Sequence, residues 1–168
     1  MSNPIYVINP NSNTSVTAVI DAAVAPLRSS DGPPVTCLTL ADGPPAIESQ
    51  RSADAVVAPR LRKAALLEED AAAFVVACFS DPGLFSLREQ SRPPVLGIAE
   101  CGVVTALTLG RSFGVVAILQ ASVARHLRYF AAMGVLGPLA ADLPVGLGVA
   151  ELADEERTLA RMISVGHT

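Results

Sequence analysis

Short apolar runs rich in β-branched residues alternate along the chain with longer segments rich in Ala, Leu and Arg. This alternation is typical of β-α units, in which each strand of a parallel sheet is followed by a helix. Two of the runs, FVVAC at 74–78 and FGVVAIL at 113–119, are apolar without a polar alternation. Such strands are expected where helices cover both faces of a sheet. The sequence therefore predicts an α/β fold: a flavodoxin-like parallel sheet with helices on both faces.

The expected elements follow from these runs and from the capping residues between them. Strands are predicted near Ile5–Ile8, Val35–Leu40, Ala73–Cys78, Val95–Gly97 and Phe113–Leu119. Helices are predicted near Ser15–Arg28, Ala53–Glu68, Gly83–Glu89, Gly102–Leu109, Val123–Met133 and Ala153–Ile163. Ser12, Asn13 and Thr14 offer N-caps for the first helix, and Asp154 with two Glu residues begins the last one.

The hydrophobic fraction is high, at 51%, yet no membrane-spanning segment is predicted. The longest weakly charged tract, 129–150, is interrupted by Gly134, Pro138 and Pro144, whereas a span needs about 20 apolar residues. The amino end, MSNPIYVINP, lacks the basic and apolar regions of a signal peptide. We therefore expect a cytoplasmic protein.

Charge and composition point to a small-molecule partner rather than a nucleic acid or a membrane. The net charge is −4, and the Arg residues are scattered instead of forming the basic face that phosphates require. Aromatic residues make up 4% of the chain, too few for a platform that stacks bases. The three cysteines lack the spacing of a zinc site, so we expect free thiols and no metal.

Two polar loops follow predicted strands, where parallel sheets bind their ligands. The loop NPNSNT after the first strand offers Asn9, Asn11, Ser12, Asn13 and Thr14. The loop CFSDPGL after the third strand offers Cys78 and Ser80, with Pro82 suited to a first helical turn. Because the first and third strands are neighbours in a flavodoxin-like order, we expect the two loops to share one crevice.

Cys78 has two interpretations. A thiol at a helix N-terminus has its thiolate stabilised by the dipole and by nearby amides, which favours a reactive nucleophile or base. A free cysteine can also be a small buried hydrophobe, and this alternative stays open for Cys78. Cys37, inside VTCLTL, is expected in the core, and Cys101 is intermediate between the two.

Other titratable groups are weaker candidates. Glu48 and Glu100 could act as general bases, but lone carboxylates on loops are usually solvated. His126 is isolated within RHLRYF and is expected on a helix face, and His167 is isolated near the end of the chain.

Four motifs together carry a resemblance to a known family: INPNSNTSVT near the amino end, GPPAIES at 43–49, VACFSDPGL at 76–84 and VLGIAE at 95–100. In this combination and order, the chain resembles the aspartate/glutamate/hydantoin racemase superfamily, and most closely its hydantoin and allantoin racemase branch.

The resemblance implies two similar α/β lobes, at 1–100 and, in part, 101–168, with a cofactor-independent active site and a homo-oligomeric assembly. In that site two cysteines face opposite sides of an acidic carbon, one removing its proton and the other returning one. Cys78 matches the first cysteine. The positions matched to the substrate pocket are Asn9, Asn11, Phe79 and Ser80, with Gln120 and Ser122 nearest to the hydroxyl residues that the family carries in its second lobe.

The family's second cysteine lies far beyond the first, in a GCAG-like motif that is missing from this chain. The ending LADEERTLARMISVGHT resembles the helix that precedes that motif, so the chain looks C-terminally truncated. The expected function is a racemase for an amino acid, a hydantoin or allantoin, impaired by the missing cysteine. The alternatives are a one-cysteine isomerase or decarboxylase of the same superfamily, or a non-catalytic vestigial protein that binds a small ligand.

Overall fold

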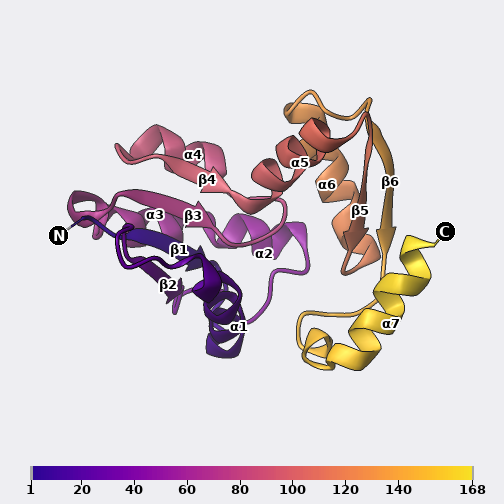
Figure 1. Ribbon diagram of the computed structural model, residues 1–168, viewed down its shortest axis with the longest axis horizontal. Helices are drawn as coiled ribbons and strands as arrows, with labels where there is room; N and C mark the ends of the chain where they lie inside the picture. Colours follow the sequence, from indigo (N-terminus) through magenta and orange to yellow (C-terminus); the bar gives the residue numbers. More distant parts are fainter. Residues whose placement is uncertain (1, 168) are drawn as a thin grey trace. The chain divides into compact units, whose positions relative to one another are not determined.

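The computed structural model describes residues 2–167 and divides into two compact units (Figure 1). The first unit runs to Ile47 and resumes over Arg51–Cys101, and the second takes Glu48–Gln50 and continues from Gly102. The predicted lobes, 1–100 and 101–168, remain a proposal about how the family's fold maps onto this chain.

The elements follow one another as alternating strands and helices. In chain order they are β1 (Ile5–Asn9), α1 (Thr14–Val24), β2 (Val35–Thr39), α2 (Gln50–Ala55), α3 (Val57–Ala65), β3 (Ala73–Val76), α4 (Leu84–Gln90), β4 (Val95–Gly97), α5 (Ile98–Leu109), β5 (Phe113–Ala117), α6 (Gln120–Ala132), β6 (Leu139–Pro144) and α7 (Glu155–Gly166). Short 3-10 turns lie at Ala25–Leu27, Glu68–Asp70 and Glu151–Ala153.

The first unit is built on a four-stranded parallel sheet in the order β2-β1-β3-β4. In its register Ile8 of β1 lies opposite Val76 of β3, and Asn9 lies opposite Thr39 of β2. The predictions of an α/β fold with parallel sheets, and of β1 and β3 as neighbours, are confirmed.

The core of the first unit lies where β1, β3 and β4 pack against α3 and α4. Phe74, Val76 and Leu87 have no exposed surface, and Ile8 and Leu84 are 1% exposed. Burying such a side chain contributes about 1.5–3 kcal/mol to the free energy of unfolding. This cluster therefore stabilises the sheet whose strands carry the polar loops at their carboxyl ends.

The second unit contains a two-stranded parallel sheet, β5-β6, with α6 and α7. Phe113 of β5 packs edge-on against Phe130 of α6, with ring centroids 5.6 Å apart. Strand β6 is not among the predicted strands, and β5 is not covered on both faces as predicted: its buried and exposed residues alternate, and Val116 is 43% exposed.

Several boundaries differ from the predictions for local reasons. The helix expected over 53–68 is broken near Val56 into α2 and α3, and α5 and α6 begin earlier than expected, at Ile98 and Gln120. Of the three predicted caps of the first helix, Asn13 is the N-cap, and its side chain accepts from Ser15 N–H. Acidic residues were expected in the first turn of the last helix: Glu155 and Glu156 lie there, while the Asp154 side chain caps the helix by accepting from Arg157 N–H. No helix within residues 2–167 has the length and apolarity to cross a membrane.

Candidate functional site

The two polar loops begin at the same edge of the first sheet, on neighbouring parallel strands. Asn9 is the last residue of β1, and Cys78 follows the end of β3 at Val76 by two residues. Ala77 N–H continues the ladder to the Ile8 carbonyl at 3.0 Å. The predicted placement of Asn9 and Cys78 at adjacent strand ends is therefore confirmed.

Cys78 is half-buried and has contacts of both kinds. Its side chain packs against an apolar cluster, and its thiol donates a long contact of 3.7 Å to the Phe79 carbonyl. The cluster consists of Leu40, Ile47, Ala53 and Val56. The thiol thus packs on apolar side chains without being sealed in the core, and the reactivity of Cys78 stays a prediction.

The segment after Cys78 is a tight loop and not the first turn of a helix. Ser80 and Asp81 have φ angles of 86° and 45°, and the Asp81 N–H closes a turn on the Cys78 carbonyl at 2.9 Å. Helix α4 begins only at Leu84, with Gly83 in a left-handed conformation as its N-cap. The predicted role of Pro82 in the first helical turn is wrong, because α4 begins two residues after it.

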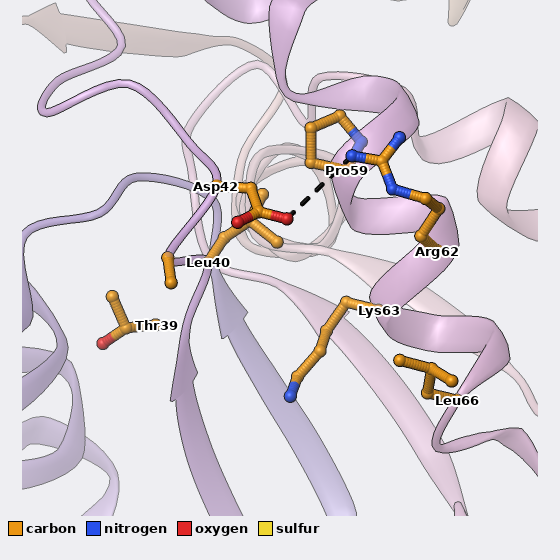
Figure 2. Close-up of a pocket in the computed structure, with 8 residues that line it drawn as sticks. Thr39, Leu40, Asp42, Pro59, Arg62, Lys63 and Leu66 are labelled. Carbon is orange, nitrogen blue, oxygen red and sulfur yellow. Dashed lines mark ion pairs between the residues drawn. The ribbon is translucent and has the colours of Figure 1, made fainter.

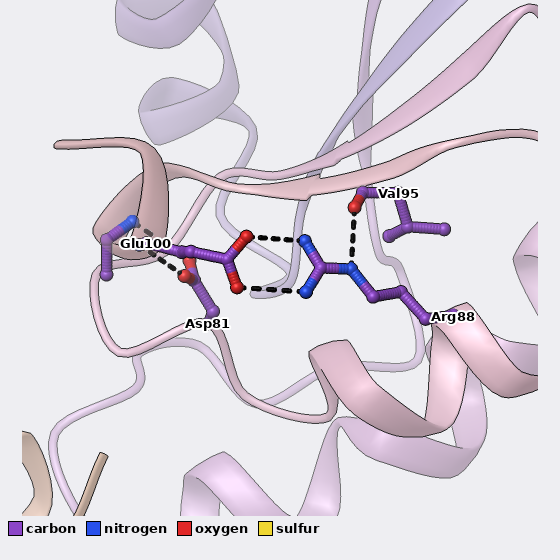
Figure 3. A network of polar contacts seen from close by, with 5 residues as sticks. Asp81, Arg88, Val95 and Glu100 are labelled. Atoms are coloured by element: carbon purple, nitrogen blue, oxygen red, sulfur yellow. Dashed lines mark hydrogen bonds and ion pairs between the residues drawn. The ribbon is translucent and has the colours of Figure 1, made fainter. Parts of the chain in front are cut away.

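The Asp81 carboxylate caps a different helix, α5 (Figure 3). It accepts hydrogen bonds from the N–H groups of Ala99 at 3.1 Å and Glu100 at 2.8 Å. Asp81 as a whole is 2% exposed. A Cβ on Gly97 would collide with this carboxylate, so glycine is required there. Two of the four motifs, at 76–84 and 95–100, are thereby joined, a role for Asp81 that the sequence did not reveal.

The sequence suggested that Glu100 is a solvated carboxylate, but the structure pairs it with an arginine. Arg88 holds it bidentately, with Nη2–Oε1 and Nη1–Oε2 distances of 2.6 and 2.9 Å, and Arg88 Nε donates to the Val95 carbonyl (Figure 3). The hydrogen bond from Arg88 lowers the pKa of Glu100. An ionised, paired carboxylate is poorly suited to act as a general base.

Asn9 organises its own loop. The residue is 1% exposed, and its amide donates to Asn11 Oδ1 at 2.9 Å, the Asn13 carbonyl at 3.2 Å and Thr17 Oγ1 at 2.9 Å. Asn11 is also buried and donates its N–H to Asn9 Oδ1. Direct contact of Asn9 or Asn11 with a ligand remains a prediction, because these side chains also hold the loop in shape.

The loop at 43–49 packs directly on the first polar loop. Ser12 N–H donates to the Pro44 carbonyl at 2.9 Å, and a Cβ on Gly43 would collide with the Pro10 carbonyl. The fold therefore pairs the four motifs two by two.

The remaining candidate residues lie in the second unit. Gln120 is exposed at the start of α6, whereas Ser122 is 1% exposed and accepts from Arg125 at 3.3 Å. Glu48 accepts the N–H of Val149 at 2.7 Å. Binding of substrate by Gln120 and Ser122 stays a prediction.

His126 was predicted to be isolated on a helix face, and this prediction is wrong. It is 3% exposed, and its Nδ1 lies 2.9 Å from Oδ2 of Asp142 in β6. Burial lowers the pKa of His126, against the opposing attraction of Asp142. No motif in the sequence indicated this pair, because Asp142 lies in a strand that was not predicted.

The other two cysteines, Cys37 and Cys101, are half-buried. Cys37 was expected in the core, and this prediction is wrong. Burial is the main cause that raises the pKa of both thiols, and nearby Asp21 adds to it at Cys37, as does Glu100 at Cys101. Neither thiol is therefore favoured as a thiolate. Within residues 2–167 no cluster of three or more His, Cys, Asp or Glu side chains could hold a metal ion.

An open pocket of about 290 Å³ lies between the end of β2 and α3 (Figure 2). Its lining consists of Thr39, Leu40, Ala41, Asp42, Pro59, Arg62, Lys63 and Leu66. Arg62 and Asp42 approach to 4.0 Å across it. Neither Asn9 nor Cys78 lines this pocket, although Leu40 belongs both to its wall and to the cluster beneath Cys78.

Comparison with known proteins relates the whole chain to one enzyme family. A family model described as Asp/Glu/Hydantoin racemase matches residues 5–168. A hydantoin racemase of Rhizobium meliloti is 36% identical over 123 residues, which cover 71% of this chain and 49% of the relative. Two solved structures are also similar. The allantoin racemase from Klebsiella pneumoniae has a TM-score of 0.86 and 28% identity, and the match covers 97% of this chain and 69% of that protein. The allantoin racemase from Pseudomonas fluorescens has a TM-score of 0.85 and 26% identity, and the match covers 96% of this chain and 68% of that protein.

The chain spans about half the length of the first two curated relatives, 49% and 46%. The match to the family model nevertheless extends over nearly all of its residues, and the structural likeness covers both units. The protein belongs to the Asp/Glu/hydantoin racemase family.

Proposed function

We propose that this protein performs cofactor-independent proton transfer at an acidic carbon, as part of a racemase for a cyclic ureide such as a hydantoin or allantoin, or for an amino acid. The observation that carries the proposal is the position of Cys78: half-buried, at a strand end beside that of Asn9, in a chain of the racemase family.

In this proposal the Cys78 thiolate removes the proton from a carbon next to a carbonyl group. The bond electrons move onto the carbonyl, and the resulting enolate-like intermediate needs hydrogen-bond donors around its oxygen. Ser80 and Asn11 are the proposed polar contacts on this side, and Phe79, which is 36% exposed, offers an apolar surface for the substituent of the substrate. Substrate binding by Gln120 and Ser122 is proposed from the family resemblance alone.

Inversion requires a second acid on the opposite face of the carbon. The family resemblance assigns that role to a second cysteine, in a motif that the 168 residues do not contain. Losing one positioned proton-transfer group costs about 10²–10⁴ in rate. We therefore propose that the 168-residue chain inverts its substrate slowly, while Cys78 can still exchange the proton on its own face.

Proton NMR in D₂O near neutral pH, with each enantiomer of a 5-substituted hydantoin and of aspartate, tests the proposal. We expect exchange at the acidic carbon above the rate without protein, retained configuration by polarimetry, loss of exchange in Cys78→Ala and normal exchange in the matched control Cys37→Ala. Exchange that persists in Cys78→Ala would remove Cys78 from the mechanism. A chain that catalyses no exchange but binds the hydantoin would be a ligand-binding protein instead.

A further inference from the structure

A fully buried arginine lies beneath the loop that carries Cys78. Arg60 belongs to α3, and its side chain has no exposed surface. Placing a guanidinium out of water is costly unless other groups compensate the charge. A cation kept in such a place in the first unit therefore calls for a specific role.

The contacts of Arg60 are directed at the end of the loop. Its Nη2 donates to the Pro82 carbonyl, and a Cβ on Gly83 would lie 2.5 Å from the same nitrogen. Gly83 has a φ of 70°, so glycine is required there both for the backbone and for the approach of the guanidinium. Among the described residues, Nε and Nη1 of Arg60 have no hydrogen-bond partner. The arginine thus supports the backbone of the loop with one nitrogen and leaves most of its charge uncompensated by hydrogen bonds.

The groups that interact electrostatically with the Arg60 charge are Cys78 and Asp81. Burial lowers the pKa of Arg60 to about 10, and the negative charges of Cys78 and Asp81 both oppose that decrease. The Asp81 carboxylate already accepts two backbone N–H groups of α5. Because an electrostatic interaction acts equally on both partners, Arg60 stabilises the thiolate of Cys78 to the same extent as the thiolate stabilises the cation.

The surroundings of Cys78 make this charge important. Four apolar residues, Leu40, Ile47, Ala53 and Val56, pack against its side chain. Apolar surroundings alone disfavour a thiolate. Helix α4 does not begin at Cys78 but six residues later, at Leu84.

We propose that Arg60 is the positioning residue for Cys78. It holds the Pro82–Gly83 backbone through its hydrogen bond to the Pro82 carbonyl, and it supplies the positive charge that stabilises the thiolate form of Cys78, which can act as a base. This role rests on the proposed function only in giving the thiolate a use. The charge effect itself can be measured without substrate.

The test is the pH dependence of iodoacetamide labelling at Cys78, followed by mass spectrometry of the cysteine peptides. An opposite charge nearby typically changes a pKa by about 1–3, so Arg60→Gln should raise the Cys78 pKa and slow its labelling near pH 7 by roughly tenfold or more. Arg60→Lys, which keeps the charge, should label at a rate close to that of the unchanged protein. Arg62→Met is the matched control, because Arg62 lies on the same helix with its side chain 64% exposed, and it should have no effect.

A purely structural arginine would give a different result. Both Arg60 variants would then lower the melting temperature and leave the Cys78 pKa unchanged, which would overturn the proposal, as would an equal rise in Arg60→Lys and Arg60→Gln. If Arg60→Gln does not fold, Arg60→Met, which fills a similar apolar volume, replaces it with the same expected rise. The deuterium-exchange assay with Cys78→Ala decides separately whether Cys78 acts on a substrate.

Discussion

Replacing Asp81 measures how strongly the loop after Cys78 depends on its contact with α5. The carboxylate accepts two backbone N–H groups, at 3.1 and 2.8 Å, and is almost fully buried. Asp81→Asn keeps one carbonyl oxygen and tolerates the φ of 45°, so it loses one of the two charge-assisted hydrogen bonds. Since a hydrogen bond to a charged group contributes about 1.5–3 kcal/mol, we expect a loss of about 2 kcal/mol in the free energy of unfolding.

Asp81→Ala should cost more, about 5 kcal/mol, because it removes both acceptors and also places an alanine in the left-handed region, which costs about 1 kcal/mol. The assay is urea unfolding followed by circular dichroism, with a lower midpoint and an unchanged slope. Asp42→Asn is the matched control, since its side chain is 76% exposed and its ion pair with Arg62 is 4.0 Å long. An Asp81→Asn protein within about 0.5 kcal/mol of the unchanged protein would refute the capping argument.

Three further changes have distinct expected results. Gly97→Ala should lower the melting temperature by several degrees, because its new Cβ collides with the Asp81 carboxylate, and differential scanning calorimetry measures this change. Arg88→Gln should lower the free energy of unfolding by about 1 kcal/mol at neutral pH, because the partly exposed ion pair with Glu100 is lost. Because the ion pair lowers the Glu100 pKa, its contribution should be complete above the ordinary glutamate pKa and disappear as the pH falls through the lowered value, as urea unfolding at each pH would show. The pKa of His126 is lowered by burial, so the unfolded chain takes up the proton first, and the free energy of unfolding should decrease as the pH falls below about 6.5, less steeply in His126→Gln.

The Gly97→Ala result has a control within the chain, and each of the three results has an outcome that would contradict it. Gly102→Ala, at a glycine of α5 whose added Cβ meets nothing within 4 Å, should be neutral or slightly stabilising, since alanine favours a helix. A Gly97→Ala protein as stable as Gly102→Ala would contradict the collision. A cost of Arg88→Gln that is the same at pH 3 and pH 7 would rule out the ion pair as its cause, and parallel pH profiles for the unchanged protein and His126→Gln would do so for the histidine.

The sequence predicted the first sheet well because its strands are short, apolar and bounded by turn residues. Runs such as the one at 73–78 leave little choice but a buried parallel strand, and the order of β1 and β3 follows from the topology that such strands favour. Strand β6 was missed because it contains Asp142 and ends at Pro144, residues that are uncommon in strands. Asp142 is tolerated there because it pairs with His126.

The local sequence could locate Cys78 at a strand end but could not identify what surrounds it. Ser-Asp-Pro-Gly reads as the start of the next helix, and Asp81 instead caps a helix that begins 17 residues later, at Ile98. Arg60 looks like one more charge on an amphipathic helix, yet the fold buries it under the loop. Both interactions join residues far apart in the chain, and neither a motif nor a periodicity records such a contact.

Arg60 and the apolar cluster beside Cys78 belong to the first unit, which separates two parts of the proposed chemistry. In the proposed role, Arg60 favours ionisation of the thiol, and the apolar cluster around Leu40 opposes it. Removal of a substrate proton on one face depends on that ionisation, whereas inversion depends in addition on an acid at the opposite face. Variants at Arg60 should therefore change the labelling of Cys78 and one-face deuterium exchange together. If labelling slows while exchange does not, the Cys78 thiolate is not the base, and the proton transfer must be assigned to another group.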